Sequence, residues 1–411
     1  MGVHVTRPLW RTPAVVLVCG AAVLSLSMGS RQTLGLFLLP MSQDYGWGRS
    51  TFAFAMALSN LLWGALQPFV GAVVDRHGAG RVTAASAVLF SAALALMAHA
   101  SNAWLLDLSA GLMLGAALSG TTFSVILGVV GRAYPPERRS MALGIATAGG
   151  SFGQFIMLPF TGALIASLGW KGALYALAAS VLVIVPLALA LVETRGHDAD
   201  SPGAPQPLGA ALREAAGHGG FWLLTAGYFV CGFHVAFIQV HLPAYLLDSG
   251  MAPGVGALGL ALIGLFNIAG SFLAGWLGGR TSKRYLLSGI YLARAVVITV
   301  FLWLPLSTLS VYLFAAGIGF LWLGTVPLTN GLVAQIFGVR HLAMLSGLVF
   351  FSHQVGGFLG VWLGGLAFDA TGSYRVVWLV AIGLGVLAGL VNLPIDERPV
   401  RRPGAVPAGA P

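Results

Sequence analysis

The sequence predicts an all-α membrane protein with twelve spanning helices arranged in two halves of six. Three observations carry this prediction: little charge, long apolar runs, and basic residues at the ends of those runs. Of the 411 residues, 57 % are hydrophobic and 8 % are charged, whereas a soluble domain has about 25 % charged residues. This composition excludes an ordinary soluble enzyme and a disordered chain. An outer-membrane barrel is excluded too, because its strands alternate apolar and polar residues.

Each helical crossing of a bilayer needs about 20 mostly apolar residues, and twelve segments meet this need. They are 13–41, 50–74, 81–100, 104–131, 140–166, 172–192, 220–247, 255–279, 285–305, 309–335, 341–368 and 374–394. In the eleventh segment, Gly356, Gly360 and Gly364 repeat every four residues. They share one helix face and predict close approach of a second helix there.

The longest connection between the segments contains several prolines and glycines. It divides the chain into an N-terminal six-helix half, 1–192, a cytoplasmic linker, 193–219, and a C-terminal six-helix half, 220–395. The tail, 396–411, is charged and then rich in Pro, Gly and Ala, which predicts a disordered cytoplasmic segment. Two halves of six are typical of transporters whose site lies at the midplane between the halves.

The basic residues predict the orientation of the chain. With the N-terminus in the cytoplasm, sixteen of the 21 basic residues fall on cytoplasmic segments and three on outer loops. This bias places both termini in the cytoplasm, and we expect a multi-pass protein of a bacterial-type inner (plasma) membrane. The net charge of +9 does not indicate a nucleic-acid partner, because the basic residues form no cluster or stripe.

A short basic loop follows the second segment, and a weak copy follows the eighth. The first loop reads Gly-Ala-Val-Val-Asp-Arg-His-Gly-Ala-Gly-Arg over 71–81, and the copy, over 275–284, has Gly279 in place of the acid. The first loop resembles the cytoplasmic signature of the major facilitator superfamily, and the resemblance covers the whole chain at the level of topology. It implies the major facilitator fold and a cytoplasmic gate; a plain turn is the alternative. The candidate gate residues are Asp75, Arg76, Arg81, Arg138 and Arg139.

The distribution of charge inside the membrane singles out two arginines. All twelve acids fall in loops or at segment ends, whereas Arg31 and Arg294 lie within segments. An arginine at the centre of a spanning helix costs roughly 2.5–3.5 kcal/mol on insertion scales. Since no acid lies at similar depth, an anionic substrate is the expected partner of Arg31, and snorkelling of its side chain is the alternative. Arg294 is open to either a functional or a structural reading.

Other polar side chains lie at comparable depth. Histidines titrate near physiological pH, while hydroxyl and amide groups in membranes often only join neighbouring helices. The candidate substrate-binding residues are Arg31, Thr121, Gln154, His234, Asn267, Asn330 and His353. His241 and Arg294 are candidates for a proton carrier or a structural charge.

Two stretches narrow the resemblance. The first reads Gly-Ser-Arg-Gln-Thr-Leu-Gly-Leu-Phe over 29–37, and the second, 134–149, has an aromatic residue, a basic pair and then small residues. Both resemble monocarboxylate transporters and the related oxalate–formate antiporter group. The resemblance puts Arg31 at the position of a substrate-linked lysine. The eighth segment departs from the pattern, because it lacks the arginine that binds carboxylate in those families.

These observations predict a secondary active transporter of a small organic anion, a monocarboxylate, that works by alternating access and proton symport. The alternative is an efflux carrier of the same fold for drugs or hydrophobic metabolites. We expect no enzyme, because no paired acids, metal ligands or nucleophile–base set share one depth. We also expect no cofactor and no metal. The expected partners are the anion, protons and membrane lipid, with the monomer as the functional unit.

Overall fold

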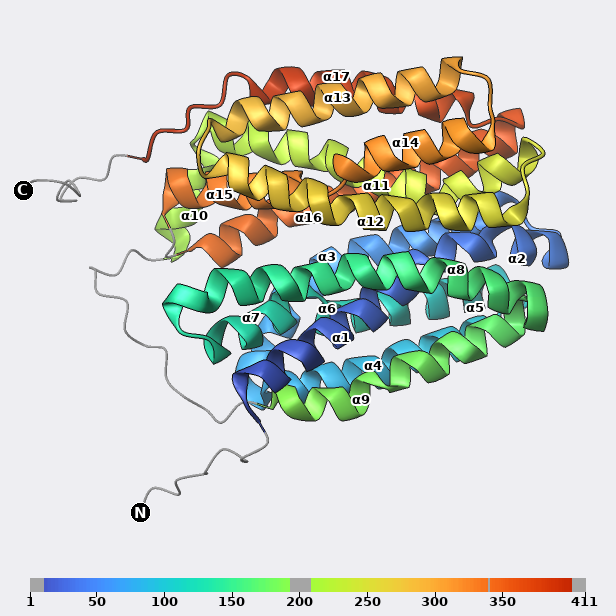
Figure 1. Ribbon diagram of the computed structural model, residues 1–411, viewed down its shortest axis with the longest axis horizontal. Coiled ribbons are helices and arrows are strands. Elements are labelled where there is room, and N and C mark those ends of the chain that lie inside the picture. The colour runs from blue at the N-terminus through green and yellow to red at the C-terminus, as the bar shows by residue number, and fades with distance from the viewer. Residues whose placement is uncertain (1–10, 193–207, 339–340, 401–411) are drawn as a thin grey trace, which may run out of the picture.

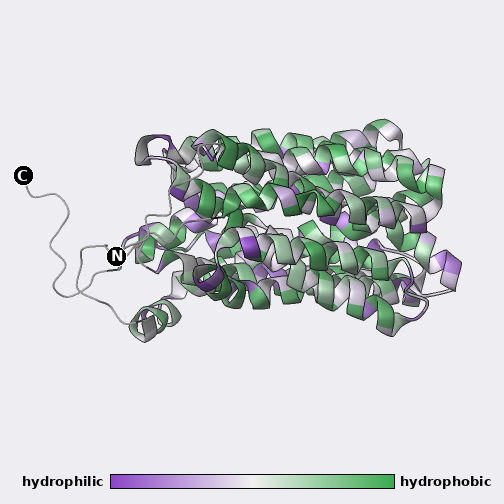
Figure 2. Cartoon of the chain, turned by 90° about the horizontal axis from the view of Figure 1, so that it is seen from below, coloured by the Kyte–Doolittle hydropathy of each residue, from purple (hydrophilic) through white to green (hydrophobic). Residues whose placement is uncertain are grey.

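The computed structural model describes residues 11–192, 208–338 and 341–400. Within these ranges, long helices lie side by side in two layers, with the blue-to-green elements in the lower part of Figure 1 and the yellow-to-red elements in the upper part. Helix α1 begins and α17 ends at the same end of the bundle, which we call the terminal end; the other end is the far end. Figure 2 shows hydrophobic residues along most of the bundle, with hydrophilic residues at its ends and at a few places between them.

The first half contains six crossings. The first crossing consists of α1 (Pro13–Gln32), η1 (Leu34–Phe37) and α2 (Leu38–Tyr45). The second and third are α3 (Arg49–His77) and α4 (Ala79–Met97), and the fourth consists of α5 (Ala103–Leu106), η2 (Asp107–Met113), α6 (Leu114–Thr121) and α7 (Phe123–Ala133). The fifth and sixth are formed by α8 (Pro136–Leu182), α9 (Ile184–Leu187) and η3 (Ala188–Leu191).

The second half repeats this order after the short helix α10 (Leu208–Ala216). Its crossings are α11 (Gly219–Asp248), α12 (Pro253–Gly278), α13 (Lys283–Trp303), α14 (Thr308–Phe320) with α15 (Thr325–Phe337), α16 (Leu342–Thr371) and α17 (Arg375–Asn392). Large apolar side chains face outward along these helices, among them Phe272 and Trp303, as expected for surfaces that contact lipid.

Eleven described segments are long and apolar enough to cross a membrane. One of them, Met141–Leu191, has 51 residues, which is more than twice the length that one crossing needs. Gly169 divides it with a φ of 71° and a ψ of 169°, a backbone conformation that suits glycine. The segment therefore provides two crossings, and the predicted twelve-helix fold in two halves is confirmed.

The fourth crossing of each half is broken near its middle. In the first half, Thr122 is extended, with a φ of −108° and a ψ of −171°, between α6 and α7. In the second half, residues 321–324 separate α14 from α15. The sequence analysis drew 104–131 and 309–335 as single segments, because both are apolar throughout and neither break contains a proline.

The glycine face of α16 packs directly against α11, as predicted. A Cβ atom on Gly360 would lie 2.6 Å from the carbonyl oxygen of Phe233, and one on Gly364 would lie 2.6 Å from the His241 ring. Gly356 faces the carbonyl oxygen of Phe229 in the same way. The two helices therefore touch through their backbones, which only glycine permits.

Part of the C-terminal tail is described. Glu397 accepts a hydrogen bond from the backbone N–H of Arg284 at 2.7 Å, and the N–H of Val400 donates to the carbonyl oxygen of Ile336 at 2.9 Å. Residues 396–400 therefore bond to α13 and α15 at the terminal end. The rest of the tail, for which we predicted disorder, lies outside the described residues, as does most of the linker.

We expect Gly360→Ala to destabilise the protein by roughly 1–3 kcal/mol, because the new methyl group must push α16 away from α11. The measurement is the thermal unfolding midpoint of the purified protein in detergent. Gly383→Ala is the matched control, since a Cβ atom there meets nothing within 4 Å and alanine favours the helix. Equal midpoints for the two variants would contradict this account of the packing.

Candidate functional site

Arg31 lies near the middle of the first crossing, the 33-residue span Pro13–Tyr45. The crossing continues beyond Arg31 through η1 and α2 to Tyr45, four residues past the predicted end at 41. Arg31 therefore lies deeper within the crossing than the sequence indicated. Its guanidinium donates to the side-chain oxygen of Asn60 on α3, and to that of Gln239 on α11 at 3.5 Å. Among the described residues, no carboxylate lies within ion-pairing distance of Arg31.

A small cavity of about 20 Å³ lies beside Arg31. Asn60 and Gln239 line it together with Ser59, Met56 and Gly35. This volume holds roughly one water molecule, so a carboxylate enters only if the surrounding side chains or helices separate. Gly35 permits the tight closure, because a Cβ atom there would lie 3.0 Å from the Cα of Val240 on α11.

Three of the other candidate residues join helices. Thr121 accepts a hydrogen bond from Ser27 at 2.8 Å. Gln154 donates to the carbonyl oxygen of Leu260 at 3.1 Å, and Asn267 donates to Ser151 at 2.9 Å. Both of the last two bonds connect α8 of the first half with α12 of the second. None of these three side chains lines the cavity beside Arg31.

The three candidate histidines occupy different places, and His241 belongs to the network at the far end that is described below. His353 on α16 is bonded to Gln354 at 3.0 Å, and Gln354 donates to the backbone oxygen of Asn60 at 3.0 Å. His353 is therefore linked through the Gln354 side chain to the backbone of Asn60, the residue whose side chain accepts from Arg31. His234 is bonded to the carbonyl oxygen of Ala381 on α17 at 2.7 Å, so the structure does not bring it to Arg31.

The two remaining candidates in the second half also lie apart from Arg31. Arg294 on α13 is 1 % exposed and donates to the carbonyl oxygens of Leu321, at 2.7 Å, and Trp322. It therefore satisfies backbone groups that the break between α14 and α15 leaves free. Asn330 on α15 is exposed.

The predicted gate residues lie at the terminal end. Arg76, Arg81 and Arg138 are exposed, and Gly78, with a φ of 86°, forms the turn between α3 and α4. The side chains of Asp75 and Arg139 are outside what the structure describes. The gate therefore stays a prediction.

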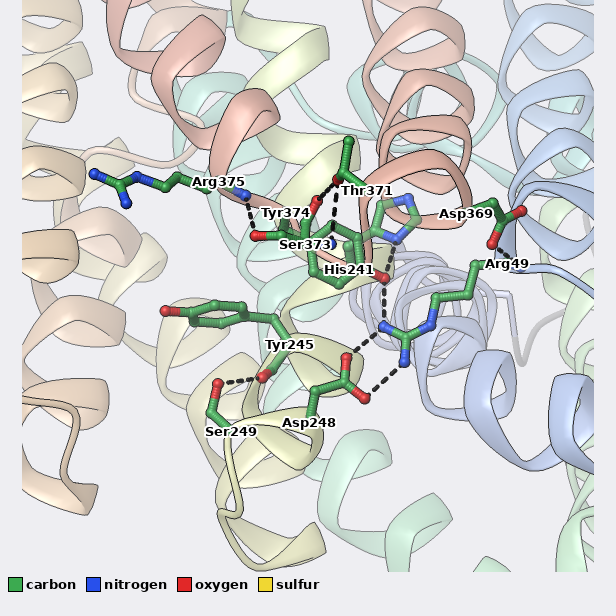
Figure 3. Close-up of polar contacts among 10 residues, drawn as sticks. All are labelled: Arg49, His241, Tyr245, Asp248, Ser249, Asp369, Thr371, Ser373, Tyr374 and Arg375. Carbon is green, nitrogen blue, oxygen red and sulfur yellow. Dashed lines mark hydrogen bonds and ion pairs between the residues drawn. The ribbon is translucent and has the colours of Figure 1, made fainter.

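Sequence reasoning missed a charged network at the far end, which Figure 3 shows. Arg49, at the start of α3, binds the carboxylate of Asp248 on α11 with two hydrogen bonds, of 2.5 and 2.6 Å. Asp369 on α16 accepts from the backbone N–H groups of Arg49 and Ser50, both at 2.8 Å. A carboxylate at a helix N-terminus is favourable, and all these bonds join the two halves.

Tyr374 continues the network toward the interior. Its hydroxyl accepts from Arg49 at 2.9 Å and lies 3.1 Å from Nδ1 of His241, whose Nε2 lies 2.8 Å from the carbonyl oxygen of Val361. Since a carbonyl oxygen only accepts, Nε2 of His241 carries the proton and Tyr374 donates to Nδ1. Burial raises the pKa of the Tyr374 phenol to about 12, so the phenol keeps the proton that this bond needs.

The sequence contained only weak signals for these residues. Asn60 and Gln239 are single amides in apolar segments, and nothing in the sequence distinguishes them from the amide candidates Gln154, Asn267 and Asn330. Arg49 counted as one of three outer-loop cations, and its partner Asp248 is 199 residues away. Their pairing depends on how α3 packs beside α16, which in turn packs against α11, and the sequence alone does not specify this arrangement.

Comparisons with known proteins agree with this architecture. The family model described as Major Facilitator Superfamily matches residues 20–330, and the chain belongs to that superfamily of membrane transporters. It resembles an uncharacterised MFS-type transporter, YcxA, of Bacillus subtilis, with 27 % identity over 90 % of this chain and 92 % of that protein. It also resembles monocarboxylate transporter 11 of Mus musculus, with 31 % identity over 89 % of this chain and 83 % of that protein.

A solved structure shows the same fold. It is that of a bacterial homologue of the human lysosomal transporter Spinster, in an inward-facing and unoccupied conformation. The TM-score is 0.78, with 16 % identity over 96 % of this chain and 99 % of that one. The expected membership of the superfamily, the likeness to monocarboxylate transporters and the major facilitator fold are therefore confirmed.

We expect Arg49→Gln to open the far end, because the carboxylate of Asp248 loses its charged partner. Hydrogen bonds to charged groups contribute about 1.5–3 kcal/mol. Because Asp248 is partly exposed, solvent screens the pair and lowers this free-energy contribution. The fraction of molecules that are open at the far end should therefore rise roughly three- to tenfold. The measurement is the distance between spin labels at positions 43 and 249, by double electron–electron resonance, with Cys19 and Cys231 replaced by serine.

Arg375→Gln is the matched control for this measurement. Arg375 lies at the same end, and its side chain points away from the network in Figure 3. If both substitutions leave the distance distribution as it is in the parent protein, the Arg49–Asp248 pair does not hold the far end closed.

Proposed function

We propose that this transporter carries a small organic anion, a monocarboxylate, by alternating access and in symport with a proton, and that Arg31 binds the anion. The observation that supports this proposal is a cationic side chain at mid-depth whose hydrogen-bond acceptors are both neutral amides. Guanidinium groups bind carboxylates through two parallel hydrogen bonds. A carboxylate would therefore replace the amide oxygens of Asn60 and Gln239 and neutralise the buried charge.

The two amides also suit alternating access. Asn60 belongs to the first half and Gln239 to the second, so Arg31 joins the halves when the pocket is empty and closed. A substrate that displaces Gln239 removes this link between the halves. We further propose that both termini lie in the cytoplasm of a bacterial-type inner membrane and that the monomer transports.

Proton coupling needs a group that binds a proton in the core. The described acids lie toward the ends of the bundle, so a histidine or the substrate must carry the proton. We propose His353, because Gln354 and Asn60 link it to Arg31. Protonated His353 would donate from both ring nitrogens and strengthen its bond to Gln354, which lies beside the anion site.

We expect Arg31→Gln to raise the KM for carboxylate uptake at least tenfold, since a charge-assisted hydrogen bond contributes about 1.5–3 kcal/mol. The measurement is uptake of labelled lactate, pyruvate, acetate and oxalate by proteoliposomes that are alkaline inside. Lys171→Gln, which removes an exposed cation at the far end, is the control. Unchanged KM and rate in folded Arg31→Gln would contradict the proposal.

The same uptake experiment also tests the alternative function, an efflux carrier for drugs or hydrophobic metabolites. If the folded wild-type protein takes up none of the four acids, the transported compound belongs to another class. A screen of drug-like and hydrophobic compounds would then be the next measurement.

We expect His353→Gln to lose uptake driven by the pH gradient while it keeps exchange of labelled for unlabelled substrate at equal pH. Exchange needs substrate binding and movement of the halves but no net proton transfer. His234→Gln is the matched control, because it removes a buried histidine that contacts Ala381 instead of the Arg31 network. Gradient-driven uptake at the wild-type rate in His353→Gln would show that His353 is not the proton carrier.

A further inference from the structure

We propose that Trp63 is a positioning residue that holds the Arg31 guanidinium in the pocket, and that Thr122, at the break of the fourth crossing, holds Trp63. The inference rests on the proposed function, in that Arg31 binds the anion. It adds two residues that do not line the cavity.

The first step is the contact between Trp63 and Arg31. The Cζ atom of Arg31 lies 4.7 Å from the centroid of the Trp63 ring, within the range of a cation–π interaction. The hydrogen bonds to Asn60 and Gln239 use the nitrogens of the guanidinium. The ring of Trp63 thus provides a further contact that fixes the direction in which the guanidinium nitrogens point.

The second step is the attachment of Trp63 to the broken helix. Its indole N–H donates to the hydroxyl of Thr122 at 3.1 Å, and the hydroxyl of Ser119 donates to its backbone oxygen at 3.2 Å. Thr122 is 1 % exposed and Trp63 is 8 % exposed. A buried indole N–H needs a hydrogen-bond partner, and this partner is the one residue with an extended backbone between α6 and α7.

The third step is the contact with the other half. The ring of Phe350 on α16 packs edge-on to Trp63 with 5.4 Å between centroids, and Phe350 stacks on His353 at 5.7 Å. Trp63 therefore contacts the anion-binding residue, the break in the fourth crossing and the second half. A change at the break would be transmitted through Trp63 to the orientation of Arg31.

The test uses two substitutions that remove the same hydrogen bond from opposite sides. Trp63→Phe keeps an aromatic face but loses the N–H, and Thr122→Val keeps the volume but loses the acceptor. We expect both to raise the KM for L-lactate and pyruvate uptake roughly three- to tenfold and to change the maximal rate less than twofold. Unchanged KM in both folded variants would overturn the proposal.

Thr83→Val separates positioning from the shape of the break. The hydroxyl of Thr83 donates to the carbonyl oxygen of Gly120 at 3.1 Å, so it supports the same break without touching Trp63. We expect its KM to equal that of the wild type. An equal rise in KM for Thr83→Val and Thr122→Val would assign the effect to the break itself and overturn the role of Trp63.

A double-mutant cycle tests whether Trp63 acts through Arg31. In an Arg31→Lys background, the planar guanidinium that stacks on Trp63 is absent. Thr122→Val should then raise the KM less than twofold; the same rise as in the wild type would show independent action.

The unfolding midpoint gives a second readout that needs no substrate. If the wild-type protein transports no monocarboxylate, the proposed function fails, but the midpoints of Arg31→Gln, Trp63→Phe and the double variant still report the contact. Their effects should be non-additive, and additive effects would overturn the positioning role.

Discussion

A buried positive charge without a carboxylate partner is the constraint on which the rest of the site depends. Arg31 lies at mid-depth, and its direct acceptors are the side-chain oxygens of Asn60 and Gln239. Neutral acceptors satisfy its hydrogen bonds but leave its charge uncompensated in a low-dielectric surrounding. A built-in carboxylate would compete with an anionic substrate, whereas two amides can be displaced at low cost. The absence of acids from the interior of the predicted spanning segments is thus as informative as the arginine itself.

Different residues in the two halves donate to the carbonyl oxygens at the break of the fourth crossing. Each fourth crossing is broken, and in each the third crossing of the same half supplies a donor to the freed carbonyl oxygens. In the first half this donor is Thr83, which bonds to Gly120; in the second it is Arg294, which bonds to Leu321 and Trp322. Arg294 was ambiguous in the sequence because this pairing depends on a break that apolar composition does not reveal.

The sequence predicted the features that follow from local composition. Segment lengths and basic residues were sufficient for the twelve crossings, and the depth of Arg31 marked the central cation. The partners of Arg31 were not predicted, because Asn60 is 29 residues away and Gln239 is 208 residues away. Depth alone also did not separate His353, which is linked to Asn60, from His234, which faces α17. Which way a helix faces decides these roles, and a nearly uniform apolar sequence contains little information about it.

The kinds of bonds between the halves indicate how the halves can separate. Near the middle they are neutral or involve amides, such as Gln154 with Leu260 and Gln354 with Asn60, each worth about 0.5–1.5 kcal/mol net. At the far end the Arg49–Asp248 pair and the cap by Asp369 add charge. In the alternating-access cycle proposed above, interactions of this size could be exchanged for others of similar size when the halves move. Under the function proposed above, a substrate that displaces Gln239 from Arg31 would remove one more link between the halves near the middle.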